Sequence, residues 1–335
     1  MNNTKTYNDY LARLDALKEE MLGIKRDPTA EERKFEAEYA VAFKDMLHTG
    51  MPQKALRRGS AGSGNFIVPD TFEQKLVKGL TDKSLLRKLG TVMKTNPTMK
   101  IPTVVAEGQA TWVPENEPVQ FSDTVYGEII LGAYKLAHKV IVSDEMLEDS
   151  EFDVEDYIRQ FFVESISAAE ETAFFTGDGK GKPLGILHQA SVGAVTSEPD
   201  AIDFDDVINL IHSVKEPYRK NAVLILSHDA LSKLRLQRLY RGRRAFDDSL
   251  KDDENDTLLG YKYYVSDHLD RVEGGGKPII FGDFSYFWIG ERGKRSVKRL
   301  VERYADHGQV AYITSERVDA KLVLPEAVKS LEVKA

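Results

Sequence analysis

The residues of this chain that could do chemistry gather in one glycine-rich run that also holds lysines. The run is Gly177-Asp178-Gly179-Lys180-Gly181-Lys182-Pro183, a composition typical of loops that bind phosphate. A Walker loop has four residues between its first glycine and its Gly-Lys pair, and then a serine or threonine that holds magnesium. Here only three residues separate Gly177 from Gly181, and Pro183 stands where the hydroxyl is needed. The spacing of a dinucleotide-binding loop is also missing.

The position of this run also differs from that of a phosphate loop. A phosphate loop opens a helix, so that free N–H groups and the helix dipole face the anion, whereas this run ends a helical pattern. We predict that Gly177 caps that helix in a left-handed conformation, that the other glycines allow a tight turn, and that an extended apolar segment follows. A nucleotide-dependent enzyme that uses residues 177–185 is the rival hypothesis, and a nucleotide-binding assay on Lys182→Ala would test it.

Other patterns typical of catalysis or metal binding are absent from the sequence. The seven histidines form no His-Glu-x-x-His pair, no Gly-x-Ser-x-Gly motif occurs, and there is no cysteine. The acidic run Asp252-Asp253-Glu254-Asn255-Asp256 lacks the glycine and the distal glutamate of a calcium loop, which favours an exposed loop. We therefore expect no enzymatic activity, no cofactor and no metal site.

The composition is that of a globular chain with an acidic surplus. The 335 residues are enough for about two domains, and the formal net charge is −8. Neither a membrane span nor the apolar core of a signal peptide is present, and the lack of cysteine fits a reducing cytosol. The basic runs at 235–244 and 292–299 are interpreted as solvated or intersubunit faces, because proteins that grip nucleic-acid phosphates usually carry a basic surplus.

The element that must position the glycine run is a long helix before it. Asp153 is suited to cap this helix, and apolar residues repeat at helical spacing from Val154 to Thr176. Such a helix is roughly 35 Å long and would be the spine of one domain. Beyond the run we expect helices at 204–214 and 228–239, and strands at 222–226, 261–265, 278–282, 284–289 and 310–324.

A second pattern, before the spine helix, predicts a long hairpin. Residues 99–105, 110–113 and 126–142 read as strands, and in the last of these alternate residues from Tyr134 to Val142 share an apolar face. The polar segment 114–118, with a proline at each end, would connect the strands outside the core. A lone hairpin is barely stable in water, so we expect another subunit to cover it.

The first 60 residues are predicted to be helical. Apolar residues from Tyr7 to Ile24 have heptad spacing, and a second apolar stripe runs from Phe35 to Leu47. Two interpretations stay open: a helical hairpin packed on the main body, or a detachable oligomerisation or scaffolding arm. The Gly- and Ser-rich composition of residues 49–65 predicts a linker accessible to proteases. Its candidate cleavage positions are Arg57, Arg58, Gly59 and Ser60.

Five short motifs follow one another along the chain after residue 63. They are Gly64-Asn65-Phe66-Ile67-Val68-Pro69, Ser84-Leu85-Leu86-Arg87, Ile101-Pro102 with Ala110-Thr111-Trp112-Val113-Pro114-Glu115, Lys135-Leu136-Ala137 with the run from Val142 to Ser150, and the run from Glu170 to Leu187. In this order and spacing, which are what is specific, the motifs resemble those of tailed-phage major capsid proteins, whose fold is named after phage Hong Kong 97. The resemblance covers about residues 64–335.

The resemblance implies an α+β tailed-phage capsid fold with an axial domain, a peripheral domain with a long spine helix, an extended β-hairpin loop and an N-terminal arm. The expected segments are 1–60 (helical, scaffold-like extension), 61–97 (N-arm and short helices), 98–142 (extended loop), 143–178 (peripheral domain with the spine helix), 179–305 (axial domain) and 306–335 (C-terminal strand region that returns through the peripheral to the axial domain).

The resemblance also implies a function, that of a major capsid protein in the icosahedral head shell of a tailed double-stranded DNA phage. Copies of the chain would form hexamers and pentamers, be assembled in the host cytoplasm and be found in the virion. Expected partners are portal, scaffold or protease proteins and packaged double-stranded DNA held without sequence-specific contact, with no membrane. The alternative is an encapsulin-type nanocompartment shell, which shares the fold and encloses protein cargo, and the N-terminal arm favours the phage.

Candidate assembly residues follow from the same resemblance. They are Trp112, Glu115 and Glu117 in the extended loop, Lys135 on its returning strand, and Gly177, Asp178 and Gly179 at the domain junction. Trp112 is our candidate anchor, because buried aromatic residues often dominate interfaces. Some relatives crosslink a loop lysine to an asparagine near the C-terminus. Here Lys100 and Lys135 flank the loop but the last asparagine is Asn255, so we predict a shell without crosslinks.

Overall fold

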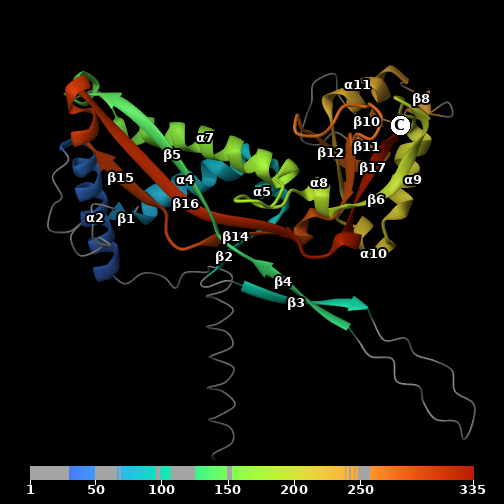
Figure 1. Cartoon of the computed structure of the whole chain (residues 1–335), viewed down its shortest axis with the longest axis horizontal. Coiled ribbons are helices and arrows are strands. Elements are labelled where there is room, and N and C mark those ends of the chain that lie inside the picture. Colours follow the sequence, from blue (N-terminus) through green and yellow to red (C-terminus); the bar gives the residue numbers. More distant parts are fainter. Residues whose placement is uncertain are drawn as a thin grey trace, which may run out of the picture.

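The computed structural model of the chain has two lobes and a projecting hairpin (Figure 1). We call the two lobes the α7 lobe, after its spine helix, and the β7 lobe, after a central strand of its sheet. The structure describes residues 30–49, 66–67, 69–95, 99–106, 125–148, 153–237, 239–240, 243–244, 246–247 and 257–335. The heptad pattern of residues 7–24, the strand predicted at 110–113, the segment 114–118 and the acidic run 252–256 lie outside these residues.

The spine helix is α7, Val154–Thr176, as predicted. The Asp153 carboxylate accepts the N–H of Asp156 at 3.4 Å, which satisfies one of the free donors at the helix start. One face of the helix is buried, with Ile158, Phe162 and Ile166 in the core of the α7 lobe. Helix α4, Asp70–Lys83, packs beside α7.

A six-stranded sheet lies against these helices, and its organising strand is β16, Gln309–Leu322. Along its length β16 pairs antiparallel with β5, β14 and β15, so that one strand connects segments from three parts of the chain. The other strands of this sheet are β1 (Phe66–Ile67), β2 (Thr91–Thr95), β5 (Tyr134–Ser143), β14 (Phe287–Arg292) and β15 (Ser296–Leu300).

The β7 lobe contains a seven-stranded sheet in the order β10-β11-β12-β7-β13-β17-β6. Helices α9 (Phe204–Ser213) and α11 (His228–Gln237) contribute Phe204, Leu210 and Leu234 to its core. The strands are β6 (Ser191–Pro199), β7 (Val223–Leu226), β10 (Phe246–Asp247), β11 (Thr257–Leu258), β12 (Tyr261–Val265), β13 (Ile279–Gly282) and β17 (Val328–Lys334).

The projecting hairpin consists of β3, Met99–Ala106, and β4, Val125–Leu131, paired antiparallel from Met99↔Leu131 outward. The single strand predicted over 126–142 is wrong, because the chain leaves one sheet after Leu131 and enters another at Tyr134. The alternation predicted for the second part is confirmed, since Val140 and Val142 of β5 are buried while Lys135 and Lys139 are exposed.

Other sequence predictions need correction. The strand predicted at 284–289 starts with a 3-10 turn, η1 (Phe284–Tyr286), because the Asp283 carboxylate accepts the N–H of Ser285. The extended segment predicted after the glycine run contains a short helix, α8. The remaining elements are α5 (Leu85–Leu89), α6 (Asp144–Glu148), α8 (Ile186–Gln189), α10 (Glu216–Arg219), β8 (Leu239–Tyr240), β9 (Arg243–Arg244), η2 (Glu302–His307) and η3 (Pro325–Ala327).

Helix α2, Ala30–Thr49, packs on the α7 lobe. Tyr39, Phe43 and Leu47 are buried there, whereas Phe35, in the first part of the helix, is 41% exposed. Of the two interpretations of the N-terminal region, the structure has this helix packed on the main body.

Candidate assembly site

The glycine run that ends α7 is a tight connection between backbone segments. Gly177 has φ −58° and ψ 143°, so the left-handed cap predicted there is wrong. A side chain is excluded for another reason: a Cβ on Gly177 would lie 2.1 Å from the Pro183 carbonyl oxygen and 2.4 Å from that of Ala173. The left-handed residues of the run are Gly179 (φ 76°) and Gly181 (φ 72°), which form the turn.

The polar groups of this run bind one another. The Asp178 carboxylate is exposed and accepts the N–H of Lys180 at 3.1 Å, and Lys182 Nζ lies 3.7 Å from it. These contacts lower the pKa of Asp178, the bond from the Lys180 N–H contributing most. The run also lies at the C-terminal end of α7, the negative end of the helix dipole. Both features disfavour the phosphate-binding hypothesis for residues 177–185.

The root of the hairpin is attached to this run and to β16. The Tyr134 hydroxyl donates to the Gly179 carbonyl at 3.1 Å, and the N–H of Gly132, which lies between β4 and β5, donates to the Asp319 carboxylate at 2.6 Å. Asp319 also accepts the N–H of Ala320 at 2.8 Å, while burial raises its pKa. The hairpin, the spine helix and β16 therefore meet at one place.

The predicted site residues divide into two groups. Lys135 is exposed on β5 beside this root, and Gly177, Asp178 and Gly179 lie at the junction, so the structure brings these four into one region. Trp112, Glu115, Glu117 and the linker residues Arg57, Arg58, Gly59 and Ser60 lie outside the described residues.

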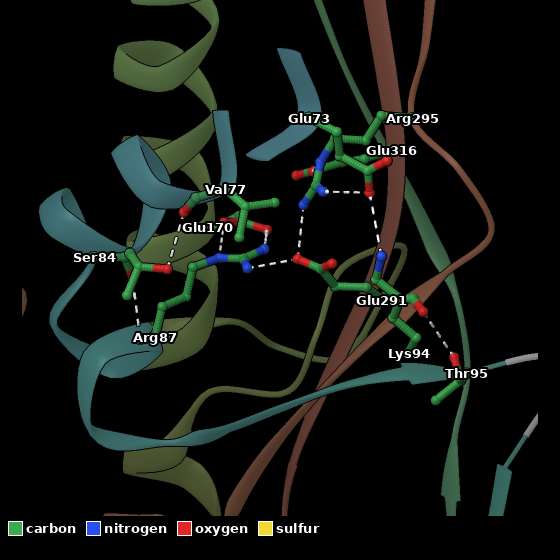
Figure 2. A network of polar contacts seen from close by, with 11 residues as sticks. Glu73, Val77, Ser84, Arg87, Lys94, Thr95, Glu170, Glu291, Arg295 and Glu316 are labelled. Carbon is green, nitrogen blue, oxygen red and sulfur yellow. Dashed lines mark hydrogen bonds and ion pairs between the residues drawn. The ribbon is translucent and has the colours of Figure 1, made fainter. Parts of the chain in front are cut away.

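Sequence reasoning missed a buried network of charges beside this junction (Figure 2). Arg87 of α5 binds Glu170 of α7 through two hydrogen bonds of 2.7 Å, and its third nitrogen binds Glu291 of β14 at 2.6 Å. Arg295 binds the same Glu291 at 2.7 Å and Glu316 of β16 at 2.6 Å. All five side chains are nearly inaccessible to solvent.

The network continues outward to α4. Arg295 lies 3.7 Å from Glu73 of α4, which also contacts the exposed Lys94 at 3.5 Å. Next to Arg87, the Ser84 hydroxyl donates to Glu171, whose pKa is raised by burial. Arg87 and Glu170 each belong to one of the five motifs that resemble the capsid family. Nothing in the sequence indicates that these two residues, 83 positions apart, form an ion pair.

The charges of the network favour one additional proton. Two arginines, Arg87 and Arg295, face three carboxylates, those of Glu170, Glu291 and Glu316, while Glu73 contacts Lys94. Glu316 Oε1 is buried without a hydrogen-bond donor in the described part of the chain. Burial, and then the nearby Glu170 charge, raise the pKa of Glu316 to about 8. A proton on this oxygen would neutralise the cluster and allow a hydrogen bond to Glu170.

Arg87 and Arg295 have the opposite effect on Glu291. Burial by itself would raise the pKa of this carboxyl group, but the two guanidinium groups outweigh burial and lower it to about 2. Burying charges is costly unless each is paired, and here each guanidinium has carboxylate partners. The network thus holds α4, α5, α7, β14 and β16 in one arrangement at the junction.

The described residues offer neither a metal site nor a membrane-spanning helix. No group of three or more His, Asp or Glu side chains among them is placed to hold a metal ion. No helix in the same part of the chain is long and apolar enough to cross a membrane.

Comparison with known proteins identifies the family. The model of the phage capsid family matches residues 64–333, about four fifths of the chain. The chain belongs to the phage capsid family. The matched region contains both lobes, the hairpin and the whole charge network, whereas α2 precedes it.

Two curated relatives of this capsid-family chain are both named major capsid protein. It is 26% identical over 317 residues to the major capsid protein of Escherichia phage T5, covering 87% of this chain and 68% of that protein. It is 25% identical over 249 residues to the major capsid protein of Klebsiella oxytoca phage phiKO2, covering 71% of this chain. The match spans 58% of the phiKO2 protein.

Solved structures similar to this family member include a capsid, and they confirm the predicted fold class. The capsid of a native GTA particle has a TM-score of 0.66 at 24% identity, covering 76% of this chain and 91% of that one. A structure from Microbacterium phage Oxtober96 has a TM-score of 0.58 at 18% identity, covering 75% and 91%. These matches do not favour the encapsulin-type alternative.

Proposed function

We propose that this chain is the major capsid protein of a tailed double-stranded DNA phage, and that its copies assemble as hexamers and pentamers into the icosahedral head shell. The observation that carries this is the projecting hairpin on a body with the capsid fold. Among the described strands, β3 and β4 hydrogen-bond only to each other, and Ile130 of β4 is 47% exposed. A lone hairpin is marginally stable in water, which supports a neighbouring copy as its cover.

Electron microscopy of the purified, concentrated protein tests this function. We expect closed shells from the full chain. A variant in which a two-residue Asn-Gly turn replaces residues 101–129 should fold but form no shells, because the surface that reaches the next copy is gone. A full-length protein that stays a compact monomer at high concentration would contradict the proposal.

We further propose that the α7 lobe is the peripheral domain and the β7 lobe the axial domain. We retain the boundaries 98–142 (extended loop), 143–178 (peripheral domain), 179–305 (axial domain) and 306–335 (C-terminal strand region), except for two segments whose strand pairing supports another assignment. Residues 134–143 (β5) and 287–300 (β14 and β15) pair with β16, so we assign them to the peripheral sheet. The C-terminal β17 pairs with β13 and β6 in the axial lobe.

For the loop, we propose Trp112 as an intersubunit anchor and Glu115 and Glu117 as further assembly residues, with Lys135 beside the root of the hairpin as another. A buried aromatic side chain at an interface often contributes more than its neighbours. Trp112→Ala should therefore leave the subunit folded and lower the yield of shells. A normal yield would remove Trp112 from this role.

For the N-terminal region, we propose that residues 1–60 guide assembly and that a phage protease cuts the chain near Arg57, Arg58, Gly59 and Ser60. The capsid-family match starts at residue 64, which is consistent with a separate role for what precedes it. Intact-mass measurement of subunits from mature particles tests the cut, and a full-length mass would refute it.

We also propose where the protein assembles and with which partners. The protein would assemble in the host cytoplasm with portal and scaffold or protease proteins, and enclose double-stranded DNA without sequence-specific contact. It would have no enzymatic activity. In a nucleotide-binding assay, the wild-type chain and Lys182→Ala should both fail to bind, because the Asp178 carboxylate occupies the nearest amide and ammonium donors.

A further inference from the structure

We propose that helix α2 is an anchor held on the α7 lobe by non-covalent contacts alone, so that a cut in residues 50–65 leaves residues 30–49 on the subunit. This goes beyond the proposed cleavage, which by itself says nothing of what becomes of the piece cut off. It also decides whether the segment before residue 30 can leave a shell or stays tethered to it.

The first support is the apolar face of the second half of α2, residues 39–47. Its inward residues follow helical spacing and are each at most 7% exposed, whereas Val41 on the opposite face is 69% exposed. A helix that touched the body only loosely would leave these inward side chains exposed. The inward residues are Tyr39, Ala42, Phe43, Met46 and Leu47.

The second support is that the groove under α2 is built from elements of the family-matched region. Phe43 packs edge-on against Phe72 of α4, with ring centroids 5.7 Å apart, and the same apolar cluster includes the N-terminal turn of α7 and the start of β16. With α2 in place, Phe72 and Tyr312 of this cluster are fully buried. The groove members are Phe72, Leu76, Val154, Ile158, Val310 and Tyr312.

The third support is polar and orients the helix. The buried Tyr312 hydroxyl donates to the Leu47 carbonyl, one of the last four helix carbonyls that have no partner within α2. Lys44 Nζ lies 3.2 Å from the Asp153 carboxylate, which caps α7. The ion pair is half-exposed and contributes little to affinity, but with the tyrosine it fixes the direction of α2 in the groove.

A cut in residues 50–65 changes the equilibrium between bound and released α2. A short flexible linker supplies an effective concentration on the order of millimolar, and a cut removes it. Most of the stability of a helix in a protein also comes from tertiary packing, so a released α2 would lose helical structure that it must regain on binding. Burial of the apolar side chains of residues 39–47 is the contribution that offsets both costs, and we expect it to hold the cut fragment at subunit concentrations of about 10 μM, a hundredfold below that effective concentration.

The test uses unassembled full-length subunits with a site for a sequence-specific protease inserted between Gly62 and Ser63. After complete cutting, size-exclusion chromatography and intact mass should find the N-terminal fragment in the same peak as the body. Separation of the fragment from a body that stays folded would overturn the proposal. Because the readout needs no shell, its failure is distinguishable from failure of the capsid function.

Matched variants separate the groove contacts from general effects. Phe43→Asp should release the fragment after cutting, whereas Val41→Asp, the same change of charge on the exposed face, should retain it. If uncut Phe43→Asp does not fold, Met46→Ala serves instead, with the released fraction rising severalfold. Release by Val41→Asp as readily as by Phe43→Asp would contradict the groove assignment.

Light scattering on the cut sample checks which copy provides the groove. A complex with the mass of one subunit supports α2 in the groove of its own chain. A complex with the mass of two subunits would place α2 in the groove of a second copy and overturn the intrachain assignment.

Discussion

At the scale of single residues, packing decides what Gly177 and Glu316 do. Gly177 is required because two carbonyl oxygens lie where its side chain would be, although its backbone angles suit any residue. Glu316 Oε1 lies against Glu170 in a cluster with one surplus negative charge. Neither property is visible in residue type, and both can be tested by single substitutions.

Gly177→Ala should destabilise the protein strongly. The added Cβ meets the Pro183 and Ala173 oxygens at 2.1 and 2.4 Å, so the junction must shift. Urea unfolding of the subunit should show a loss of about 3 kcal/mol or more, as for other overpacked sites. Gly181→Ala is the control: nothing lies within 4 Å of its Cβ, and only the left-handed backbone is strained, at about 1 kcal/mol. Equal losses in both variants would contradict the role of close packing at Gly177.

Glu316→Gln should change how stability depends on pH. The folded-state pKa of Glu316 lies above its ordinary value of 4.5, so between about 4.5 and 8 the folded chain binds more protons than the unfolded chain. The free energy of unfolding contributed by Glu316 is therefore full below pH 4.5 and falls as the pH rises toward 8, by at most about 1.4 kcal/mol per unit.

Glutamine cannot ionise, so the free energy of unfolding of the variant should not show this decline. The variant should therefore become more stable relative to the wild type as the pH rises from 5 to 8. Urea midpoints measured across that range provide the comparison, with exposed Glu302→Gln as the control. Parallel curves for wild type and Glu316→Gln would rule out the extra proton. Glu291 acts at the acidic end of the pH range. Because its pKa is lowered, its contribution to the free energy of unfolding is lost as the pH falls from 4.5 toward 2.

At the scale of elements, the hairpin root depends on two hydrogen bonds across segments. Gly132 and Tyr134 lie on either side of the point where the chain leaves the hairpin sheet, and they bind Asp319 of β16 and Gly179 of the glycine run. The direction of the hairpin is thus set by β16 and by the end of α7, and not by the hairpin itself.

Asp319→Ala should loosen this root. It leaves the Gly132 N–H without its acceptor, at a cost of about 1–3 kcal/mol. We expect faster amide hydrogen exchange at Gly132 and along β4, with the β7 lobe unchanged. Asp319→Asn keeps an acceptor oxygen and should exchange nearly as the wild type does. Unchanged exchange in the alanine variant would mean that other contacts hold the root.

At the scale of the whole molecule, the two lobes are connected by short stretches of chain. The chain passes from β16 in the α7 lobe to β17 in the β7 lobe through residues 323–327, and from α7 to β6 through the glycine run and α8. On the side of the α7 lobe, the charge network joins the elements that carry Arg87, Glu170 and Glu291 (Figure 2).

The proposed shell should contain no covalent crosslinks between subunits. No asparagine occurs between Asn255 and Ala335, so this stretch offers no asparagine partner for Lys100 or Lys135. Heated particles should run as a single subunit band on a denaturing gel. A ladder of covalent multimers would contradict this prediction.

The sequence by itself determined the elements with strong local signals. Helical spacing and an aspartate cap gave the bounds of α7, and alternation gave the two faces of β5, because these patterns depend only on neighbours along the chain. The order of five short motifs was enough to indicate the family. Only the tertiary structure decided that Gly177 is a close contact, that the strand breaks at Gly132, that α2 fills a groove, and that Arg87 meets Glu170 and Glu291. These depend on residues brought together from distant positions, and no spacing in the sequence encodes such distances.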